Sequence, residues 1–194
     1  MQLKLDNNVS QFAEEIESLS GLKVYDCYQC GKCSAGCPVG QFTEESPTRL
    51  IRLIQLNQKE AVLNSRTPYL CATCSTCSER CPMNIDVAKI METVRILASR
   101  EHVKSPVKEV AAFSGAFLDS VKSNGRLFEF GMTISFNLRN LTPLKDAMLG
   151  PVMLQKGKLA LWPRSIKNKE RIKRIFEKSS YFEPRAESTG KKEH

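Results

Sequence analysis

The sequence predicts a mainly α-helical protein. Apolar residues recur at intervals of three and four along most of the chain, and strand-like alternation is confined to one stretch near residue 130. All eight cysteines lie between Cys27 and Cys81, in two copies of one pattern, and a segment with helical spacing separates the copies. We therefore expect a cysteine-rich helical domain over residues 1–104 and a helical extension over residues 105–194.

Length and composition fit a small domain with an extension. Of the 194 residues, 41% are hydrophobic, which is enough to form a core, and 10 Gly and 9 Pro argue against a largely disordered chain. The N-terminus lacks the apolar segment of a signal peptide, and no apolar run approaches the ~18 residues of a membrane span. We expect a cytoplasmic protein with no membrane span, whose clustered cysteines bind metal rather than form disulfides.

The first helices follow from apolar spacing and from start signals. Residues 10–19 place Phe12 and Ile16 on one face, and Gly21 follows as a stop. Ser46-Pro47 is typical of a helix start, with Ser as the N-cap and Pro in the first turn. It predicts a helix near residues 47–63, between the two cysteine copies.

The later helices carry similar signals. Asp86 can cap a helix whose apolar stripe covers residues 87–98, and Ser105-Pro106 repeats the Ser-Pro start for a helix that ends at Asn124-Gly125. Residues 127–141 fit both a strand and a helix, and we favour the helix because no other strand exists to pair with them. Residues 143–154 and 164–178 are further predicted helices, and the last dozen residues are expected to fray.

The cysteine pattern carries the chemistry. Each copy reads C-x2-C-x2-C-x3-C-P, the sequence by which bacterial ferredoxins bind 4Fe–4S clusters. Three cysteines at three-residue steps can hold three corners of one cluster, while the fourth, followed by Pro, reaches the other cluster. We therefore predict two 4Fe–4S clusters, the first ligated by Cys27, Cys30, Cys33 and Cys81 and the second by Cys71, Cys74, Cys77 and Cys37.

The residues between the cysteines suit this role. Most are small, so that backbone N–H groups can approach the sulfur atoms and stabilise the reduced cluster. Lys32 and Arg80 lie inside the loops and either assist in this way or are solvated cations. Structural zinc is the competing interpretation, but a zinc site pairs two C-x2-C knuckles and does not need the third cysteine or the terminal Cys-Pro. A helix between the copies indicates a helical ferredoxin-like domain.

Charge is concentrated at the C-terminus. Residues 156–194 hold 12 Lys and Arg against 5 Asp and Glu, whereas the remainder is close to neutral. Basic residues together with Trp162, Phe176 and Tyr181 are a combination also found on nucleic-acid-binding surfaces. The tail matches no known nucleic-acid-binding module, however, and we expect no nucleic-acid partner. His102 and His194 are too few and too scattered for a catalytic triad or a histidine metal site, and no Gly-rich phosphate loop follows a strand. We therefore expect no catalytic residue on this chain.

Both motifs, the segment between them and the tail together resemble the C subunit of the heterodisulfide reductases of methanogenic archaea. The residues that carry the resemblance are Tyr28-Gln-Cys-Gly-Lys-Cys33, Cys71-Ala-Thr-Cys74, Cys77-Ser-Glu-Arg-Cys81-Pro82, Gly125-Arg-Leu-Phe128 and Lys156-Gly-Lys-Leu159. The cysteine run by itself is also shared with iron–sulfur subunits of succinate dehydrogenase, fumarate reductase and glycolate or glycerol-3-phosphate oxidoreductases.

The resemblance implies a non-catalytic electron-relay subunit of an oxidoreductase complex used in methanogenesis. In that complex the A subunit, which contains flavin and iron–sulfur clusters, would supply electrons. The catalytic B subunit would reduce the disulfide of coenzyme M and coenzyme B. The resemblance also leaves open a larger assembly with a hydrogenase or a formate dehydrogenase. The B subunit is recognised by adjacent cysteines, and this chain has none.

Two alternatives stay open. The chain could be an iron–sulfur subunit of another oxidoreductase, of the succinate/fumarate or glycolate/glycerol-3-phosphate type. It could also be a metal-stabilised nucleic-acid module that uses the basic tail, which would bind with a steep salt dependence. For the relay, we expect part of the extension, with the basic helix over residues 164–178, to dock on the catalytic partner.

Overall fold

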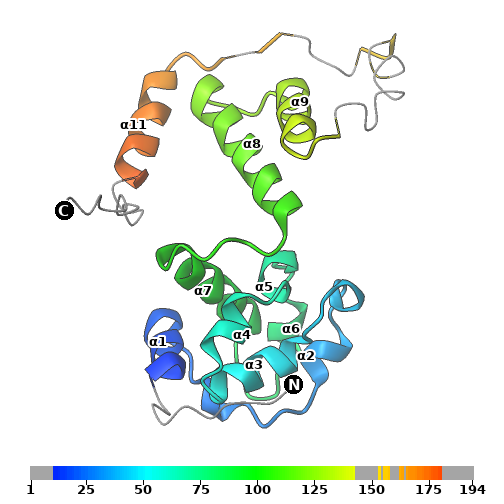
Figure 1. Cartoon of the computed structure of the whole chain (residues 1–194), viewed down its shortest axis with the longest axis vertical. Helices are drawn as coiled ribbons and strands as arrows, with labels where there is room; N and C mark the ends of the chain where they lie inside the picture. Colours follow the sequence, from blue (N-terminus) through cyan, green and yellow to red (C-terminus); the bar gives the residue numbers. More distant parts are fainter. Residues whose placement is uncertain (1–10, 143–152, 154, 158–161, 164, 181–194) are drawn as a thin grey trace, which may run out of the picture. The chain divides into compact units, whose positions relative to one another are not determined.

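The computed structural model describes residues 11–142, 153, 155–157, 162–163 and 165–180. The described residues form helices and no strand, so the predicted mainly α-helical class is confirmed (Figure 1). The helix favoured for residues 127–141 is also confirmed, as α9 (Glu129–Arg139). The chain divides between Val107 and Lys108 into two compact units.

The core of the first unit lies between four helices. These are α1 (Gln11–Ser20), α3 (Pro47–Gln55), α4 (Lys59–Leu63) and α7 (Val87–Arg100), and α7 contacts both α1 and α4 (Figure 1). Each helix buries one apolar face, as the spacing predicts, and each large aliphatic side chain so buried contributes about 1.5–3 kcal/mol. The fully buried core residues include Ile16, Leu50, Ile54, Val62, Ile90 and Val94.

The N-caps predicted at Ser46 and Asp86 are confirmed. The Ser46 hydroxyl accepts a hydrogen bond from the Arg49 backbone N–H at the start of α3. The Asp86 carboxylate accepts one from the Lys89 backbone N–H, at 3.1 Å, at the start of α7. These caps fix where α3 and α7 begin, and both helices begin beside the cysteine loops.

The prediction of one helix near residues 47–63 was wrong, because the chain breaks into α3 and α4. Asn57 lies in the break with a left-handed φ of 53°. Its side-chain oxygen accepts a hydrogen bond from the Ala13 backbone N–H, at 2.9 Å, which ties the break to α1. Asn tolerates the left-handed conformation at a helix end, and the contact with α1 selects it. A further short helix, α5 (Thr67–Leu70), precedes the second cysteine motif.

Short elements form the cysteine motifs themselves. The first motif follows the 3-10 turn η1 (Val24–Asp26) and contains α2 (Lys32–Ala35), and a second 3-10 turn, η2 (Gly40–Phe42), comes after it. The second motif contains α6 (Thr76–Glu79), which contacts α2. The two motifs are therefore packed against each other, although 33 residues separate them in the sequence.

The second unit consists, in its described part, of α8 (Lys108–Asn124), α9 and α11 (Lys169–Ser180), with α8 in contact with the other two. Helix α8 begins two residues later than the Ser-Pro signal predicts, because the Ser105 hydroxyl bonds to the Val107 backbone and forms a turn. Helix α11 begins at Lys169, later than predicted. The helix predicted over residues 143–154 falls almost wholly outside the described residues, as does the frayed end.

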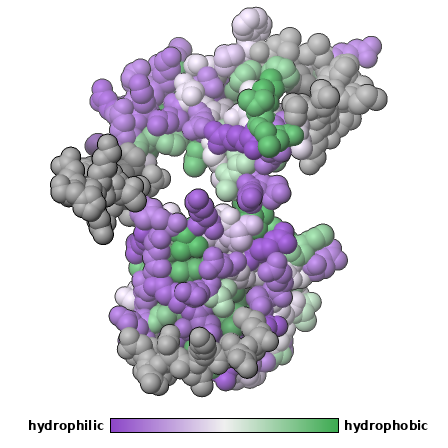
Figure 2. Space-filling model, viewed as in Figure 1, coloured by the Kyte–Doolittle hydropathy of each residue, from purple (hydrophilic) through white to green (hydrophobic). Residues whose placement is uncertain are grey.

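The second unit buries little apolar surface among its described residues. Phe113 and Phe136 pack edge to face, with ring centroids 5.9 Å apart, and Arg139 pairs with Asp119. However, Phe113, Leu118 and Ile134 remain 47–51% exposed. Figure 2 shows hydrophobic surface over α9 and hydrophilic surface over α11.

Candidate metal centre

Two of the cavities in the first unit are each lined by four cysteines. Each cavity takes three cysteines from one motif and the fourth from the other motif. Among the described residues, no three His, Cys, Asp or Glu side chains are placed so that they could hold a single metal ion. One cavity is lined by Cys27, Cys30, Cys33 and Cys81, and the other by Cys71, Cys74, Cys77 and Cys37.

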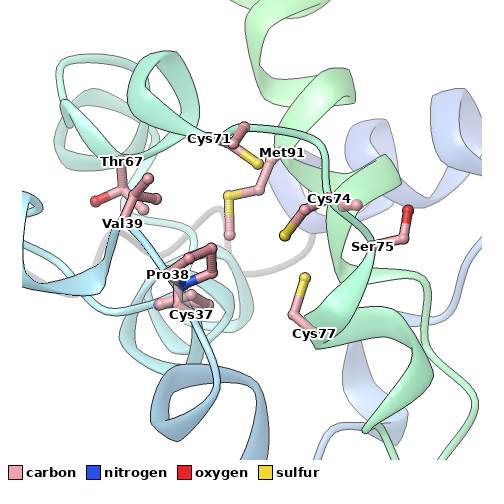
Figure 3. A pocket seen from close by; sticks show the side chains of 12 residues that line it. Cys37, Pro38, Val39, Thr67, Cys71, Cys74, Ser75, Cys77 and Met91 are labelled. Atoms are coloured by element: carbon pink, nitrogen blue, oxygen red, sulfur yellow. The ribbon is translucent and has the colours of Figure 1, made fainter.

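These are the two groups of four that the sequence predicts as cluster ligands. The structure brings together all eight predicted residues, in the predicted crossed arrangement, while ligation itself stays a prediction. In the second cavity the sulfur atoms of Cys71, Cys74 and Cys77 point inward, close to the thioether of Met91 (Figure 3). We call the cavity lined by Cys27 the first cavity and the one lined by Cys71 the second.

The backbone of the two motifs follows one pattern. The second residue after the first cysteine is left-handed in both, Gln29 with a φ of 64° and Thr73 with a φ of 49°. The fourth is left-handed as well, Gly31 at 80° and Ser75 at 58°, and each directly precedes a right-handed helical turn. A left-handed residue joined to right-handed ones aims successive N–H groups into a concavity that suits an anion.

This conformation is unusual for the residues that adopt it. A β-branched residue such as Thr73 rarely adopts a positive φ, and a residue in such a conformation costs on the order of 1–3 kcal/mol. Strain of this kind is typical of ligand-binding loops, where the surroundings enforce it. The loops are therefore shaped for what they hold rather than for their own stability.

The fourth cysteine of each motif leaves its loop by the same turn. The Cys37 N–H donates to the Ser34 carbonyl, at 3.2 Å, and the Cys81 N–H donates to the Ser78 carbonyl, at 3.1 Å. A proline follows each of these cysteines. The side chain of Arg80 lies against the Cα of Gly36, directly before Cys37, so that no larger residue fits there without moving it.

A serine after the third cysteine anchors each motif to a helix, and sequence reasoning missed this function. The Ser34 hydroxyl accepts a hydrogen bond from the Thr48 N–H, at 3.0 Å, and the Ser78 hydroxyl accepts one from the Ala88 N–H, at 3.2 Å. Thr48 and Ala88 are each the second residue of their helix, α3 and α7. The available signal was that both motifs place Ser at this position.

Asp86 connects the second motif to α7. Its carboxylate accepts hydrogen bonds from the Ser78 hydroxyl, at 2.6 Å, and from the Lys89 N–H. The Ser78 hydroxyl and, to a smaller extent, the backbone N–H groups at the start of α7 hold the pKa of Asp86 below its usual value. The carboxylate is therefore ionised at neutral pH.

The thiols respond to their surroundings in different ways. Burial raises the pKa of Cys27, and the nearby Cys33, Cys81 and Cys30 raise it further. Burial also raises the pKa of Cys77, whereas the Thr76 hydroxyl lowers that of Cys74. Since only thiolates bind iron, the buried thiols release their protons when a metal cluster binds.

Apolar side chains complete both cavities. Ile51, Ile85 and Val87 line the first cavity, and Val39, Pro47 and Met91 are among those that line the second. Each cavity also has one exposed cysteine, Cys30 in the first and Cys74 in the second. Four thiols in an apolar surround, beside N–H-rich loops, fit a 4Fe–4S cluster, and an exposed ligand gives electrons a short route to the surface.

Comparison with known proteins agrees with this geometry. Residues 26–86 match a family described as a 4Fe-4S dicluster domain. The chain contains a 4Fe–4S dicluster domain. The match begins directly before Cys27 and ends at Asp86, so it includes all eight cysteines. The predicted cofactors, two 4Fe–4S clusters, are confirmed by this match.

Several curated relatives are C subunits of heterodisulfide reductases from methanogens. The C subunit of the H2:CoB-CoM heterodisulfide,ferredoxin reductase from Methanothermobacter marburgensis is 29% identical over 57% of this chain and 60% of its own length. The iron-sulfur C subunit of the CoB–CoM heterodisulfide reductase from Methanopyrus kandleri is 36% identical over 50% of each chain. The C subunit of a ferredoxin:CoB-CoM heterodisulfide reductase from Methanosarcina acetivorans is 27% identical over 88% of this chain and 68% of its own length.

The resemblance that the motifs indicate is thus confirmed. The chain spans 60% of the length of the M. marburgensis relative and half that of the M. kandleri relative. Within the described part of the chain, no helix combines the length and apolar character needed to cross a membrane.

Proposed function

We propose that this protein is the electron-relay subunit of a heterodisulfide reductase. The observation that carries the proposal is the pair of cavities, each lined by three cysteines of one motif and one of the other, in a chain whose relatives are C subunits of such enzymes. The eight cysteines would hold the two clusters in the groups that line the cavities. Electrons from the flavin-containing A subunit would pass through these clusters to the catalytic B subunit.

The electron balance requires a second chain for the chemistry. Reduction of the coenzyme M–coenzyme B disulfide takes two electrons and two protons and yields two thiols, whereas a 4Fe–4S cluster supplies one electron at a time. All eight cysteines of this chain line the two cavities, and none remains for a third centre. The S–S bond would therefore be broken on the B subunit, in the cytoplasm, and this chain would deliver the electrons in two successive steps.

The second unit is suited to hold the partner. Its described helices leave Phe113, Leu118 and Ile134 about half exposed, and α11 carries five Lys and Arg against two Glu. Exposed apolar side chains and a basic helix in one unit favour binding to a partner with an acidic surface, and the charges would mainly speed the encounter and orient it. A hydrogenase or formate dehydrogenase would join the same assembly as the source of electrons.

Reconstitution tests the proposal. The full chain, purified anaerobically, is combined with the flavin-containing and catalytic partners, and disulfide reduction by a reduced dye is measured. We expect co-purification and reduction that depends on this chain. Reduction at the same rate without it, or co-purification with a dehydrogenase flavoprotein instead, would support the alternative oxidoreductase.

A truncation after Leu161 tests docking separately. The shortened chain should keep both clusters but lose disulfide reduction and binding to the catalytic partner, because α11 is removed while the cavities are intact. A matched full-length variant with Lys173 and Arg174 changed to Glu should weaken binding in the same direction, and more so at low salt. If the truncated chain keeps its clusters and supports full reduction, the tail is not the docking element.

A further inference from the structure

Helices α3 and α7 meet the two cavities in equivalent ways, but one pair of residues differs. Thr48 in α3 and Ala88 in α7 occupy the same helix position and donate their backbone N–H to the equivalent serines. Thr48 lines the first cavity and Ala88 lines the second. Only Thr48 has a hydroxyl, and its oxygen lies 3.2 Å from the Cys33 sulfur.

The direction of the hydrogen bonds at the first cavity follows from counting protons. A cluster-bound thiolate has no proton, so between Cys33 and Thr48 the Thr48 hydroxyl must be the donor. The Thr48 oxygen then accepts the proton of the Ser34 hydroxyl, 2.6 Å away, and the Ser34 oxygen accepts the Thr48 N–H. Every donor in this ring is used, and Ser34 holds the Thr48 hydroxyl in position.

The second cavity lacks a donor at the position equivalent to Thr48. Ala88 has no hydroxyl, and the Ser78 hydroxyl, which lies close to the Cys77 sulfur, gives its single proton to the Asp86 carboxylate at 2.6 Å. Other side-chain contacts to sulfur occur at both cavities, and a hydrogen bond between Tyr28 and Cys30 adds one at the first. Gln29 contacts Cys27 at 3.5 Å, and Thr76 contacts Cys74 at 3.4 Å.

Hydrogen bonds to cluster sulfur favour the reduced state, because reduction adds negative charge. The effect is larger away from water, and Cys33 is the buried cysteine of the eight, at 8% exposure. The Thr48 hydroxyl therefore acts where the surroundings screen it least.

We propose that Thr48 makes the cluster in the first cavity the more easily reduced of the two. The inference rests on the proposed ligation by the eight cysteines. If both clusters are bound, an electron that arrived at the second cluster would pass downhill to the first, which would gain the electron that the second loses, with no proton transferred and no bond broken. Electrons would then enter beside Cys74 and leave beside Cys30, the exposed cysteines of the two cavities.

The test is an anaerobic redox titration of the full chain, followed by electron paramagnetic resonance. We expect two midpoint potentials in the native protein. Thr48→Val, which keeps the shape but removes the hydroxyl, should lower the higher midpoint and leave the other unchanged, and Thr48→Ser should restore it. Ala88→Ser, which adds the missing donor, should raise the lower midpoint.

The midpoints of the variants decide the role of Thr48. If Thr48→Val leaves the higher midpoint in place or moves the lower one, or if Ser does not restore it, Thr48 does not set the order. If Thr48→Val fails to load iron, the Ala88→Ser variant provides the test. An unchanged lower midpoint in iron-loaded Ala88→Ser protein would overturn the proposal. Iron analysis tests the proposed ligation separately from the effect of Thr48. A native chain with about four irons instead of about eight would contradict the ligation of two clusters by the eight cysteines.

Discussion

Replacing Asp86 with alanine should destabilise the first unit by about 2 kcal/mol. Loss of an N-cap costs about 1 kcal/mol, and α7 loses the acceptor for its Lys89 N–H. The bond from the Ser78 hydroxyl, at 2.6 Å to a charged but partly exposed group, adds about another 1 kcal/mol. With a urea dependence of about 2 kcal/mol per molar, the unfolding midpoint should fall by about 1 M.

The matched control is Asp86→Asn. Asn is as good an N-cap as Asp and keeps an oxygen that can accept from Ser78, so this variant should lose only the part due to charge. Because folding lowers the pKa of Asp86, the ionised carboxylate contributes stability above the unfolded pKa of about 3.9, and this contribution is lost as the pH falls through the folded value. The two variants should therefore differ from the native chain most at neutral pH and least in acid.

Anaerobic urea unfolding, followed by circular dichroism together with visible absorbance of the clusters, measures both effects. Equal losses in Asp86→Ala and Asp86→Asn would refute the reasoning, because the cap would then not account for the difference. A loss in Asp86→Ala that grows towards acid would also refute it, since the sign of the charge contribution would be reversed.

Two further perturbations test the cavities. Cys81→Ser should disturb the spectrum of the cluster that Cys27 is proposed to ligate, although Cys81 belongs to the second motif. A structure of the iron-loaded protein with Cys81 and Cys71 bound to the same cluster would contradict this. Gly36→Ala should lower the yield of iron-loaded protein, because the Arg80 side chain occupies the space that a methyl group needs. The double variant Gly36→Ala, Arg80→Ala should recover that yield. If iron analysis shows no recovery, the lower yield is due to the backbone and not to Arg80.

Sequence patterns predicted the features that depend on neighbours in the chain. The Ser46 and Asp86 caps are local signals, and the two groups of four cysteines follow from a spacing repeated twice. The break after α3 was missed because the left-handed Asn57 is held by Ala13, which lies 44 residues away. The Ser34–Thr48 contact was missed for the same reason, since it joins a loop to a helix 14 residues further along.

The crossed arrangement of the cysteines has a consequence for assembly. Each cluster, if ligated as proposed, joins residues 27–37 to residues 71–81 and so closes the same long loop of chain. Binding of the first cluster includes the loss of chain entropy on closing that loop, whereas the fourth ligand of the second cluster is then already close to the other three. Loading should therefore be cooperative, with few chains that hold one cluster at limiting iron, and damage to either cluster should loosen its neighbour.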